Sequence, residues 1–248
     1  MKKALLSLII AVSMVATPAF AAKVRIGTEG AYAPWNFIDD SGKLAGFEIE
    51  LGNALCKKAG IDCEFVQNEW DSMIPNLIAG NYDLIMAGMS ITDERKQSID
   101  FSMDYYPPDP SAFAAGASMS FNFDGLSGKR IATQGATVQA GYLEETYGAK
   151  NTIVSYETLD QAVADLMAGN VDMLLADGSY LKPIVDGSGG ALAITGPSPM
   201  IGGGVGIGMR KNESDLAGKM AKALKAAKAD GTVDRLIKKY FDAGPFYN

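Results

Sequence analysis

The chain has 248 residues, of which 48% are hydrophobic and 21% are charged, and its net charge is −7. It has no histidine and two cysteines, which excludes Ser-His-Asp and Cys-His catalysis, His-ligated zinc, zinc ribbons and Cys-ligated iron–sulfur centres. The acidic balance also argues against a nucleic-acid binder, and the composition is that of an ordinary globular protein.

Residues 1–21 have the pattern of a secretory signal peptide. Lys2 and Lys3 precede a mostly apolar run over 4–16, and residues 19–21 (AFA) form a small-residue cleavage site. The apolar run is too short to span a membrane, although a retained anchor is the alternative. Cleavage would change the net charge from −7 to −9 and leave an exported mature protein.

The mature chain opens with a β-rich run over 24–28 that ends at a glycine turn. In the next clear segment, ALCKKAGIDC, Gly60 ends a helix and residues 64–66 predict a strand. Export favours a disulfide between Cys56 and Cys63, which would stabilise the fold by about 2–3 kcal/mol. Two free thiols are the alternative, whereas redox catalysis would need the spacing Cys-x-x-Cys.

Residues 70–88 and 159–177 are similar at a constant offset of 89 residues. Each segment predicts a helix with an aspartate N-cap (71–78 and 160–167), an Ala-Gly-Asn turn and a buried strand (84–86 and 173–175). The identical pairs are Asp71/Asp160, Leu77/Leu166, Ala79/Ala168, Gly80/Gly169, Asn81/Asn170, Asp83/Asp172 and Ala87/Ala176. Chance similarity between α/β units is the alternative to an internal repeat.

A second match, at an offset of 105 residues, aligns 25–31 (RIGTEGA) with 130–136 (RIATQGA). It predicts a strand over 130–133 that corresponds to the strand over 24–28. Both halves therefore alternate strands and helices in the same order. We expect an α/β fold made of two similar lobes.

Two segments are expected to connect the lobes. Residues 104–113 contain three prolines, which interrupt regular structure. Residues 201–210 alternate glycine with apolar residues but do not satisfy G-x-G-x-x-G, so we expect a strand that returns to the first lobe. Lobe 1 is then expected over 22–108 and 203–248, and lobe 2 over 109–202, with a hinge near 104–113 and 198–204.

The C-terminal segment predicts two helices, one capped by Ser214 and one over 233–241. The first helix has an apolar face made of Leu216, Met220, Leu224 and Ala227. Such a face predicts packing against the first lobe.

The repeat also indicates where a ligand would bind. In open α/β sheets, ligands bind beyond the carboxyl ends of the strands. Glu29 and Gln134 are equivalent at the first strand of each lobe, and Gly88 and Asp177 are equivalent at a later strand. We expect these residues to line a cleft whose two sides differ chemically, which suits an asymmetric polar ligand.

Five segments carry a family resemblance: EGAYAPWNF, GFEIELGNALCKKAG, NEWDSMIPNLIAGNYDLIMAGMSITDERK, LSGKRIATQGAT and KADGTVDRLIKKYFD. They resemble the periplasmic polar-amino-acid-binding proteins of ATP-driven (ABC) importers, the family of the lysine/arginine/ornithine-, histidine- and octopine/nopaline-binding proteins. The resemblance covers nearly all of the mature chain. It implies a two-lobed periplasmic-binding-protein-like fold, an amino-acid or opine ligand, a membrane permease as partner, and no cofactor, metal or nucleic acid.

The resemblance implies contacts to the ligand carboxylate. Arg95, in SITDER, matches the arginine that grips the α-carboxylate, which a guanidinium can do bidentately. A surface ion pair with Asp93 or Glu94 is the alternative. Thr137 matches a second contact near the start of a helix, while Val138 departs from the glutamine often found there.

The resemblance also implies further contacts to the amino-acid end of the ligand. Ala87, Gly88 and Ser90 match positions that offer backbone groups and a hydroxyl. Ala87 and Gly88 depart from the serines of the histidine and lysine/arginine binders and resemble the opine binders, so they leave room for an N-substituted ligand. Asp177 matches the carboxylate that holds the α-ammonium, with a helix N-cap as the alternative.

Tyr32 and Trp70 match aromatic walls around the ligand side chain, with contacts of about 0.5–2 kcal/mol, although core packing is the alternative. Trp35 is expected in the core. Glu29 matches an acidic position at the far end of the pocket, where a buried carboxylate needs a cationic partner. The expected ligand is arginine, ornithine, lysine or an arginine-derived opine.

The expected mechanism is capture by closure, in which a monomer bends at its hinge around the ligand and then delivers it to the permease. The protein is therefore expected not to be an enzyme. An exported dehydratase-like enzyme of the same fold is the alternative, and Glu29 is the only plausible general acid for it.

Overall fold

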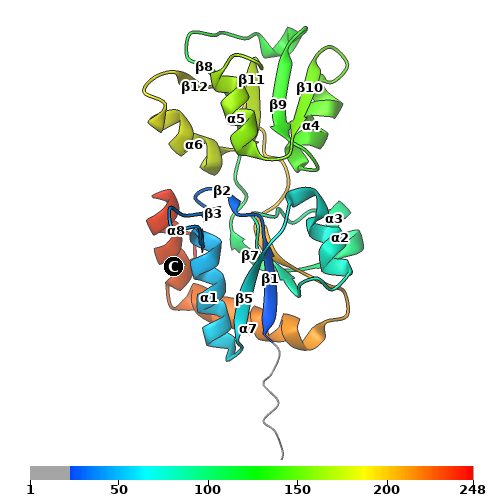
Figure 1. Cartoon of the computed structure of the whole chain (residues 1–248), viewed down its shortest axis with the longest axis vertical. Coiled ribbons are helices and arrows are strands. Elements are labelled where there is room, and N and C mark those ends of the chain that lie inside the picture. The colour runs from blue at the N-terminus through cyan, green and yellow to red at the C-terminus, as the bar shows by residue number, and fades with distance from the viewer. Residues whose placement is uncertain (1–22, 248) are drawn as a thin grey trace, which may run out of the picture.

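The structure, a computed structural model, describes residues 23–247, and the expected signal peptide at 1–21 lies outside the described residues. Two lobes lie one above the other along the long axis of the molecule (Figure 1). Each lobe combines one five-stranded sheet with helices. The two-lobed α/β fold expected from the repeat is therefore confirmed.

The first lobe is built on a sheet in the order β5-β1-β6-β13-β7, with strands Cys63–Gln67 (β5), Val24–Thr28 (β1), Leu84–Ile85 (β6), Val205–Met209 (β13) and Asp100–Tyr106 (β7). The second lobe has the order β10-β9-β11-β8-β12, with strands Thr152–Tyr156 (β10), Arg130–Gln134 (β9), Met173–Asp177 (β11), Ser111–Gly116 (β8) and Leu192–Thr195 (β12). A small third sheet joins Ala31–Tyr32 (β2), Asn36–Ile38 (β3) and Leu44–Ala45 (β4).

The two large sheets share one pairing pattern. In each, three parallel strands are followed by a fourth strand that runs antiparallel to both of its neighbours. The sheets are therefore mixed rather than parallel throughout. In the first lobe the fourth strand is the glycine-rich β13, as expected. A Cβ at Gly206 would lie 2.8 Å from Ile91 Cδ1, so glycine makes room there for a neighbouring side chain.

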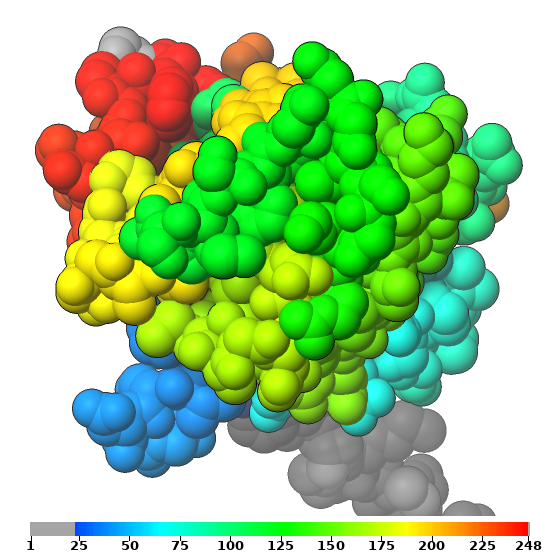
Figure 2. All heavy atoms as spheres, turned by 90° about the horizontal axis from the view of Figure 1, so that it is seen from above, coloured from blue at the N-terminus to red at the C-terminus, as the bar shows by residue number. Residues whose placement is uncertain are grey.

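The helices are Phe47–Ala59 (α1), Met73–Ile78 (α2), Asp93–Ser98 (α3), Val138–Tyr147 (α4), Leu159–Met167 (α5), Gly178–Gly187 (α6), Ser214–Ala229 (α7) and Thr232–Phe241 (α8), with short 3-10 helices at Trp70–Ser72 (η1) and Phe123–Gly125 (η2). The C-terminal helix α8 belongs to the first lobe and lies beside α6 of the second lobe (Figures 1 and 2). No helix within residues 23–247 is long and apolar enough to cross a membrane.

Three of the expected helix caps are wrong. Asp71 lies within η1, and α2 begins only after this short 3-10 helix. Asp160 lies in the first turn of α5, and the cap is Thr158, whose hydroxyl forms a reciprocal capping box with the third helical residue. Ser214 is the first residue of α7 rather than its cap. At α5, a hydroxyl two residues earlier thus competes successfully with an aspartate as the cap.

Two short crossings connect the lobes. Residues 107–110 lead from β7 to β8, and residues 196–204 lead from β12 to β13. The strands extend further into 104–113 than expected, because all three prolines of this segment fall within 107–110. The two crossings are thus where the chain passes between the two sheets.

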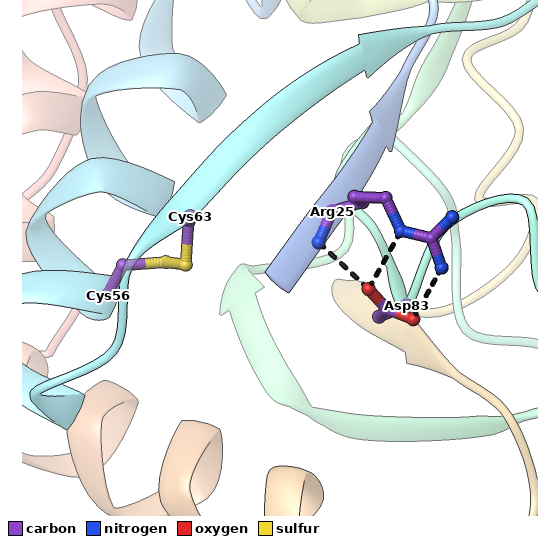
Figure 3. The surroundings of a disulfide bond; sticks show 4 residues. All are labelled: Arg25, Cys56, Cys63 and Asp83. Atoms are coloured by element: carbon purple, nitrogen blue, oxygen red, sulfur yellow. Dashed lines mark hydrogen bonds and ion pairs between the residues drawn. A yellow bond between two sulfur atoms is a disulfide. The ribbon is translucent and has the colours of Figure 1, made fainter. Parts of the chain in front are cut away.

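Two covalent or ionic links fix the far end of the first lobe. The expected disulfide is present: Cys56 at the end of α1 is bonded to Cys63 at the start of β5, with Cα atoms 6.2 Å apart (Figure 3). In the same view, the backbone N–H and the guanidinium of Arg25 donate to Asp83 (Figure 3). This ion pair lies at the start of β1, opposite to the carboxyl ends of the parallel strands.

Candidate functional site

A cavity lies between the two lobes. Its wall combines the carboxyl ends of strands from both sheets with the first turn of α4, and all nine residues predicted to bind a ligand are part of it. We call this space the interlobe cavity. Its lining consists of Glu29, Tyr32, Trp70, Ala87, Gly88, Ser90, Arg95, Thr133, Gln134, Thr137, Val138, Gln139, Leu159, Leu175, Ala176 and Asp177.

Glu29 and Gln134, equivalent in the repeat, meet across the cavity. The Gln134 Nε2 atom donates to Glu29 Oε1 at 2.6 Å and to the carbonyl oxygen of Glu157 at 2.9 Å. Only 6% of Glu29 is exposed, and this burial raises the pKa of its carboxyl to about 7. The hydrogen bond from Gln134 opposes the shift, while nearby Asp160 adds to it. None of the ion pairs within residues 23–247 includes Glu29, so its carboxyl is buried without a cationic side chain beside it.

Asp177 lies at the end of β11 and accepts two side-chain hydrogen bonds. The Tyr32 hydroxyl donates to one carboxylate oxygen, and Gln139 Nε2 donates to the other at 2.7 Å. Burial raises the pKa of Asp177 to about 6, which both hydrogen bonds and the charge of Arg95 counteract. Asp177 is also the N-cap residue of α6, but its side chain makes no capping hydrogen bond, so its carboxylate faces the cavity rather than the helix.

Tyr32 is only 5% exposed and is part of an aromatic stack that joins the lobes. Its ring is nearly parallel to that of Tyr180, 5.1 Å away, and to that of Trp35, 6.0 Å away. Trp35 is buried in the core, as expected, among Phe47, Tyr106 and Phe241. The Tyr32 ring is thus engaged by protein, and its hydroxyl points to Asp177.

Gly88 does not enlarge the cavity as its small size suggested. A Cβ built at Gly88 would lie 2.6 Å from Tyr32 Cε1, so the Tyr32 ring fills the space that a side chain would need. Gly88 also has a left-handed φ of 63°, which favours glycine there. The expectation of extra room beside Gly88 is therefore wrong for this arrangement.

Arg95 is half-buried at the edge of the cavity, next to Trp70. Its Nη1 atom donates to the carbonyl oxygen of Ser90 at 2.9 Å, and its Cζ atom lies 5.3 Å from the Trp70 ring centroid. Burial lowers the pKa of Arg95, while the charges of Asp177 and Glu94 raise it. The ion pairs of the described residues do not join Arg95 to an acidic neighbour in α3, which leaves the guanidinium available to an anion in the cavity.

Trp70 also reaches the second lobe. It is half-buried, and its Nε1 atom donates across the cleft to the carbonyl oxygen of Ala136 at 3.2 Å. Ala136 has a left-handed φ of 52°, which is uncommon for a residue with a side chain. The indole therefore closes one side of the cavity and also packs against a hydrophobic cluster of the first lobe.

Thr137 has its hydroxyl engaged within its own lobe. Its Oγ1 atom accepts from the N–H of Ala140 at 3.1 Å, as the N-cap of α4, and donates to the carbonyl oxygen of Gln134 at 2.7 Å. What the first turn of α4 can offer to an anion is therefore its backbone N–H groups, which point outward from a helix N-terminus.

Gln139 is a residue that sequence reasoning missed. It lies one position after Val138, where the absence of a glutamine suggested a missing polar contact, and its Nε2 atom reaches Asp177 and Ser111. The glutamine in the first turn of a predicted helix was the available signal. The sequence did not predict its contact with Asp177, because the direction of a side chain in this turn depends on the folded structure.

Two mixed sheets, joined by two crossings and closed over a cavity that contains three charged side chains, define a two-lobed solute-binding protein. Residues 24–243 match the bacterial extracellular solute-binding proteins, family 3, and the chain belongs to that family.

Three similar proteins cover almost the whole chain. The chain is 38% identical to the L-arginine-binding protein of Pseudomonas aeruginosa, over 97% of both chains. It is 37% identical to the lysine/arginine/ornithine-binding periplasmic protein of Escherichia coli K12, over 98% of both. The crystal structure of a periplasmic His/Glu/Gln/Arg/opine family-binding protein from Silicibacter pomeroyi in complex with lysine has 50% identity and a TM-score of 0.83, covering 90% of this chain and 100% of that one.

Proposed function

We propose that the protein binds an amino acid with a cationic side chain in the interlobe cavity and delivers it to an ATP-driven permease. The charge pattern of the cavity supports this proposal: two carboxylates, Glu29 and Asp177, and one guanidinium, Arg95, line it. Arginine, lysine and ornithine carry the complementary set, two cationic groups and one carboxylate. Buried charges need partners of opposite sign, which favours these ligands over neutral or acidic ones.

Each charge of the ligand then has one partner. Arg95 and the N–H groups at the start of α4 bind the α-carboxylate, and Asp177 binds the α-ammonium. Ser90 and the backbone of Ala87 and Gly88 complete this end of the ligand.

The side chain of the ligand runs past Trp70 toward Glu29. A cation there takes a position between the indole and the carboxylate, where cation–π contact contributes about 0.5–2 kcal/mol. Tyr32 acts differently from a stacking wall, because its ring already contacts Trp35 and Tyr180, and it serves instead to orient Asp177.

Closure traps the ligand. Three side-chain hydrogen bonds already join the lobes around the cavity, from Gln134 to Glu29, from Tyr32 to Asp177 and from Trp70 to Ala136. Bending at residues 107–110 and 196–204 would separate these partners and open the cavity. Small-angle X-ray scattering is expected to show compaction when arginine is added, and an unchanged radius of gyration would contradict capture by closure.

The relatives support the ligand class and the location. Two are named for arginine, or for lysine, arginine and ornithine, and the Silicibacter pomeroyi structure contains lysine. The pattern of residues 1–21 and the periplasmic relatives support a periplasmic location for the mature protein, and a cavity lined by residues of one chain supports a monomer. The closed form is the one that a permease would recognise.

A thermal-shift panel followed by calorimetry tests the proposal. The panel contains the twenty amino acids, ornithine, citrulline and octopine, because a ligand at 100 times its Kd adds about 2.7 kcal/mol to the free energy of unfolding. Arginine, lysine and ornithine should give the largest shifts. Octopine should give a smaller one, since the Tyr32 ring fills the space beside Gly88. A largest shift from an acidic or apolar amino acid would contradict the proposal.

One observation favours an enzyme as the second candidate. The pKa of Glu29, raised to about 7, suits a general acid near neutral pH. Incubation with prephenate or arogenate followed by mass spectrometry would detect a dehydratase, and a product that disappears in the Glu29→Gln variant would establish it. We expect unchanged substrate, because Glu29 serves as the partner of a bound cation.

A further inference from the structure

Glu48 is a buried carboxyl group that the proposed ligand contacts do not use. It is the second residue of α1, its exposed fraction is 0%, and it does not line the interlobe cavity. None of the ion pairs within residues 23–247 includes it. Apolar residues of similar volume commonly replace buried charged groups without loss of stability, so core packing alone does not explain a carboxylate here.

Three donors from three separate segments converge on Glu48. The N–H of Gly88 donates to Oε1 at 2.7 Å, Asn36 Nδ2 donates to Oε2 at 2.7 Å, and the Tyr105 hydroxyl also donates to Oε1. These bonds and the N-terminal turn of α1 both favour negative charge at this position. Burial nevertheless raises the pKa of Glu48.

The acceptor-only character of a carboxylate determines how Asn36 is oriented. Because Glu48 can only accept, Asn36 must turn its NH₂ group toward Glu48 and its oxygen away. That oxygen then accepts the N–H of Gly30 at 2.7 Å. An amide at position 48 could present an NH₂ group instead, which would let Asn36 flip and leave the N–H of Gly30 facing another donor.

The three segments are those that shape the cavity and the hinge. Gly30 follows Glu29, and Gly88 supports the Tyr32 ring that reaches Asp177. Tyr105 lies on β7, which leads directly into the crossing at 107–110. One carboxylate behind the cavity wall therefore connects both glycine turns with the strand that enters the hinge.

We infer that Glu48 is a positioning residue for ligand binding: it holds the turns at Gly30 and Gly88 and the hinge strand at Tyr105 in one arrangement. This inference rests on the proposed function, because the arrangement matters for affinity only if the interlobe cavity binds a ligand. Glu48 touches no ligand and acts through the backbone that it holds.

The test compares two isosteric substitutions on the same helix. Glu48→Gln removes the acceptor-only group, whereas Glu50→Gln removes a carboxylate that faces Lys239 and Tyr240 on the other side of α1. Calorimetry with L-arginine should show about tenfold weaker binding for Glu48→Gln. Glu50→Gln should remain within about twofold of the wild type. Thermal unfolding of both variants without ligand checks that each is folded.

Amide NMR reports directly on the hydrogen bond through which Glu48 would hold the turn at Gly88. The Gly88 amide proton should shift upfield in Glu48→Gln, which loses the charged acceptor. It should shift downfield in Tyr105→Phe, because Glu48 Oε1 then accepts a hydrogen bond from Gly88 only. Tyr105→Phe also serves as the second variant if Glu48→Gln does not fold.

Two failures can be told apart. A wild-type protein that binds no amino acid would overturn the proposed function, and this inference with it. A wild-type protein that binds arginine while Glu48→Gln binds equally well would overturn only the role of Glu48. If Glu48→Gln does not fold, an unshifted Gly88 amide proton in Tyr105→Phe would likewise overturn only the role of Glu48.

Discussion

The ends of the two lobes that lie away from the cavity are built alike. Arg25 lies near the start of β1, and Arg130 lies at the start of β9. The backbone N–H of Arg25 donates to Asp83 at 2.9 Å, and that of Arg130 donates to Asp172 at 2.7 Å. Each guanidinium also donates to the carbonyl oxygen of a glycine in the turn that precedes that aspartate, Gly80 in the first lobe and Gly169 in the second. Equivalent residues here make equivalent contacts within each lobe.

The ends that face the cavity differ at the same strands. Glu29 of the first lobe meets Gln134 of the second, and Gly88 corresponds to Asp177. The far ends therefore repeat what a lobe needs in order to fold, whereas the cavity ends differ where the proposed ligand is asymmetric. Substitutions at equivalent positions can separate these two roles.

The largest effect is expected from Asp177→Asn. Loss of the buried partner of the ligand ammonium should weaken arginine binding by about 100-fold, measured by calorimetry, with little change in the unfolding temperature. Asp172→Asn, at the far end of the same strand, is the matched control. It should lower stability by about 1 kcal/mol and leave affinity unchanged. Equal affinities for the two variants would remove the distinction between the two ends.

Glu29→Gln should change selectivity more than it changes binding as such. We expect about 10- to 30-fold weaker binding of arginine, because its side chain loses a charged partner, and an unchanged affinity for glutamine. The exposed Glu69, at the rim of the cleft, provides the control, since Glu69→Gln removes an equal charge from a solvated position. An equal loss for arginine and glutamine would argue against Glu29 as the cation partner.

The affinity for arginine should fall as the pH is lowered. The pKa of Glu29 is raised to about 7 and that of Asp177 to about 6, so both carboxyls take up protons between pH 8 and pH 5, and a protonated carboxyl attracts a cation less. Below the pKa of each group, its protonation lowers the affinity for arginine by up to about tenfold per pH unit. Calorimetry at several pH values should show this slope, and a shallower slope in Glu29→Gln. A pH-independent affinity would contradict it.

The raised pKa of Glu29 also makes the stability of the ligand-free protein depend on pH, and stability should fall with rising pH where the affinity for arginine rises. Because folding raises the pKa of Glu29 from 4.5 to about 7, the folded state binds more protons than the unfolded state in this range. The contribution of Glu29 to stability is present below pH 4.5 and is lost as the pH rises to 7. Thermal unfolding should show a flatter pH dependence in Glu29→Gln, and identical curves would exclude this contribution.

The smallest effect is expected from the two far-end arginines. Arg25→Ala should lower stability by about 1 kcal/mol, and Arg130→Ala by about half as much, because the Arg130 side chain is more exposed and its ion pair is 3.5 Å long rather than 3.0 Å. Thermal unfolding measures both, and calorimetry should find arginine binding unchanged. A larger effect for Arg130 would reverse this ranking of the two lobes.

Much of the fold could be predicted because local patterns and the repeat agreed. The strand over 24–28 has the expected bounds, and Gly80 and Gly169 adopt φ angles of 80° and 75° at the expected helix ends. The helix starts were harder, since Thr158 and Asp160 both suit a cap and only the fold decides between them. The antiparallel fourth strands could not be predicted, because their pairing depends on how the chain crosses between lobes.

The candidate site was predictable in position and less so in detail. The repeat predicted that Glu29 and Asp177 line the same cavity. The sequence does not show which side chains are already engaged by other residues of the protein and which are open to a ligand. The contact of Tyr32 with Gly88 and the reach of Gln139 to Asp177 depend on packing between residues far apart in sequence. Glu48 gave no signal, because its three donors come together only in the folded lobe.

The position of β13 has a consequence for the order of folding. All strands of the second sheet lie within residues 111–195, whereas the first sheet needs residues 205–209 to fill the place between β6 and β7. A chain that emerges with its N-terminus first can complete the second lobe while the first still has two unpaired strand edges. The lobe that begins first is thus the one whose sheet is completed last, when 209 of the 248 residues have emerged, and its helices α7 and α8 follow.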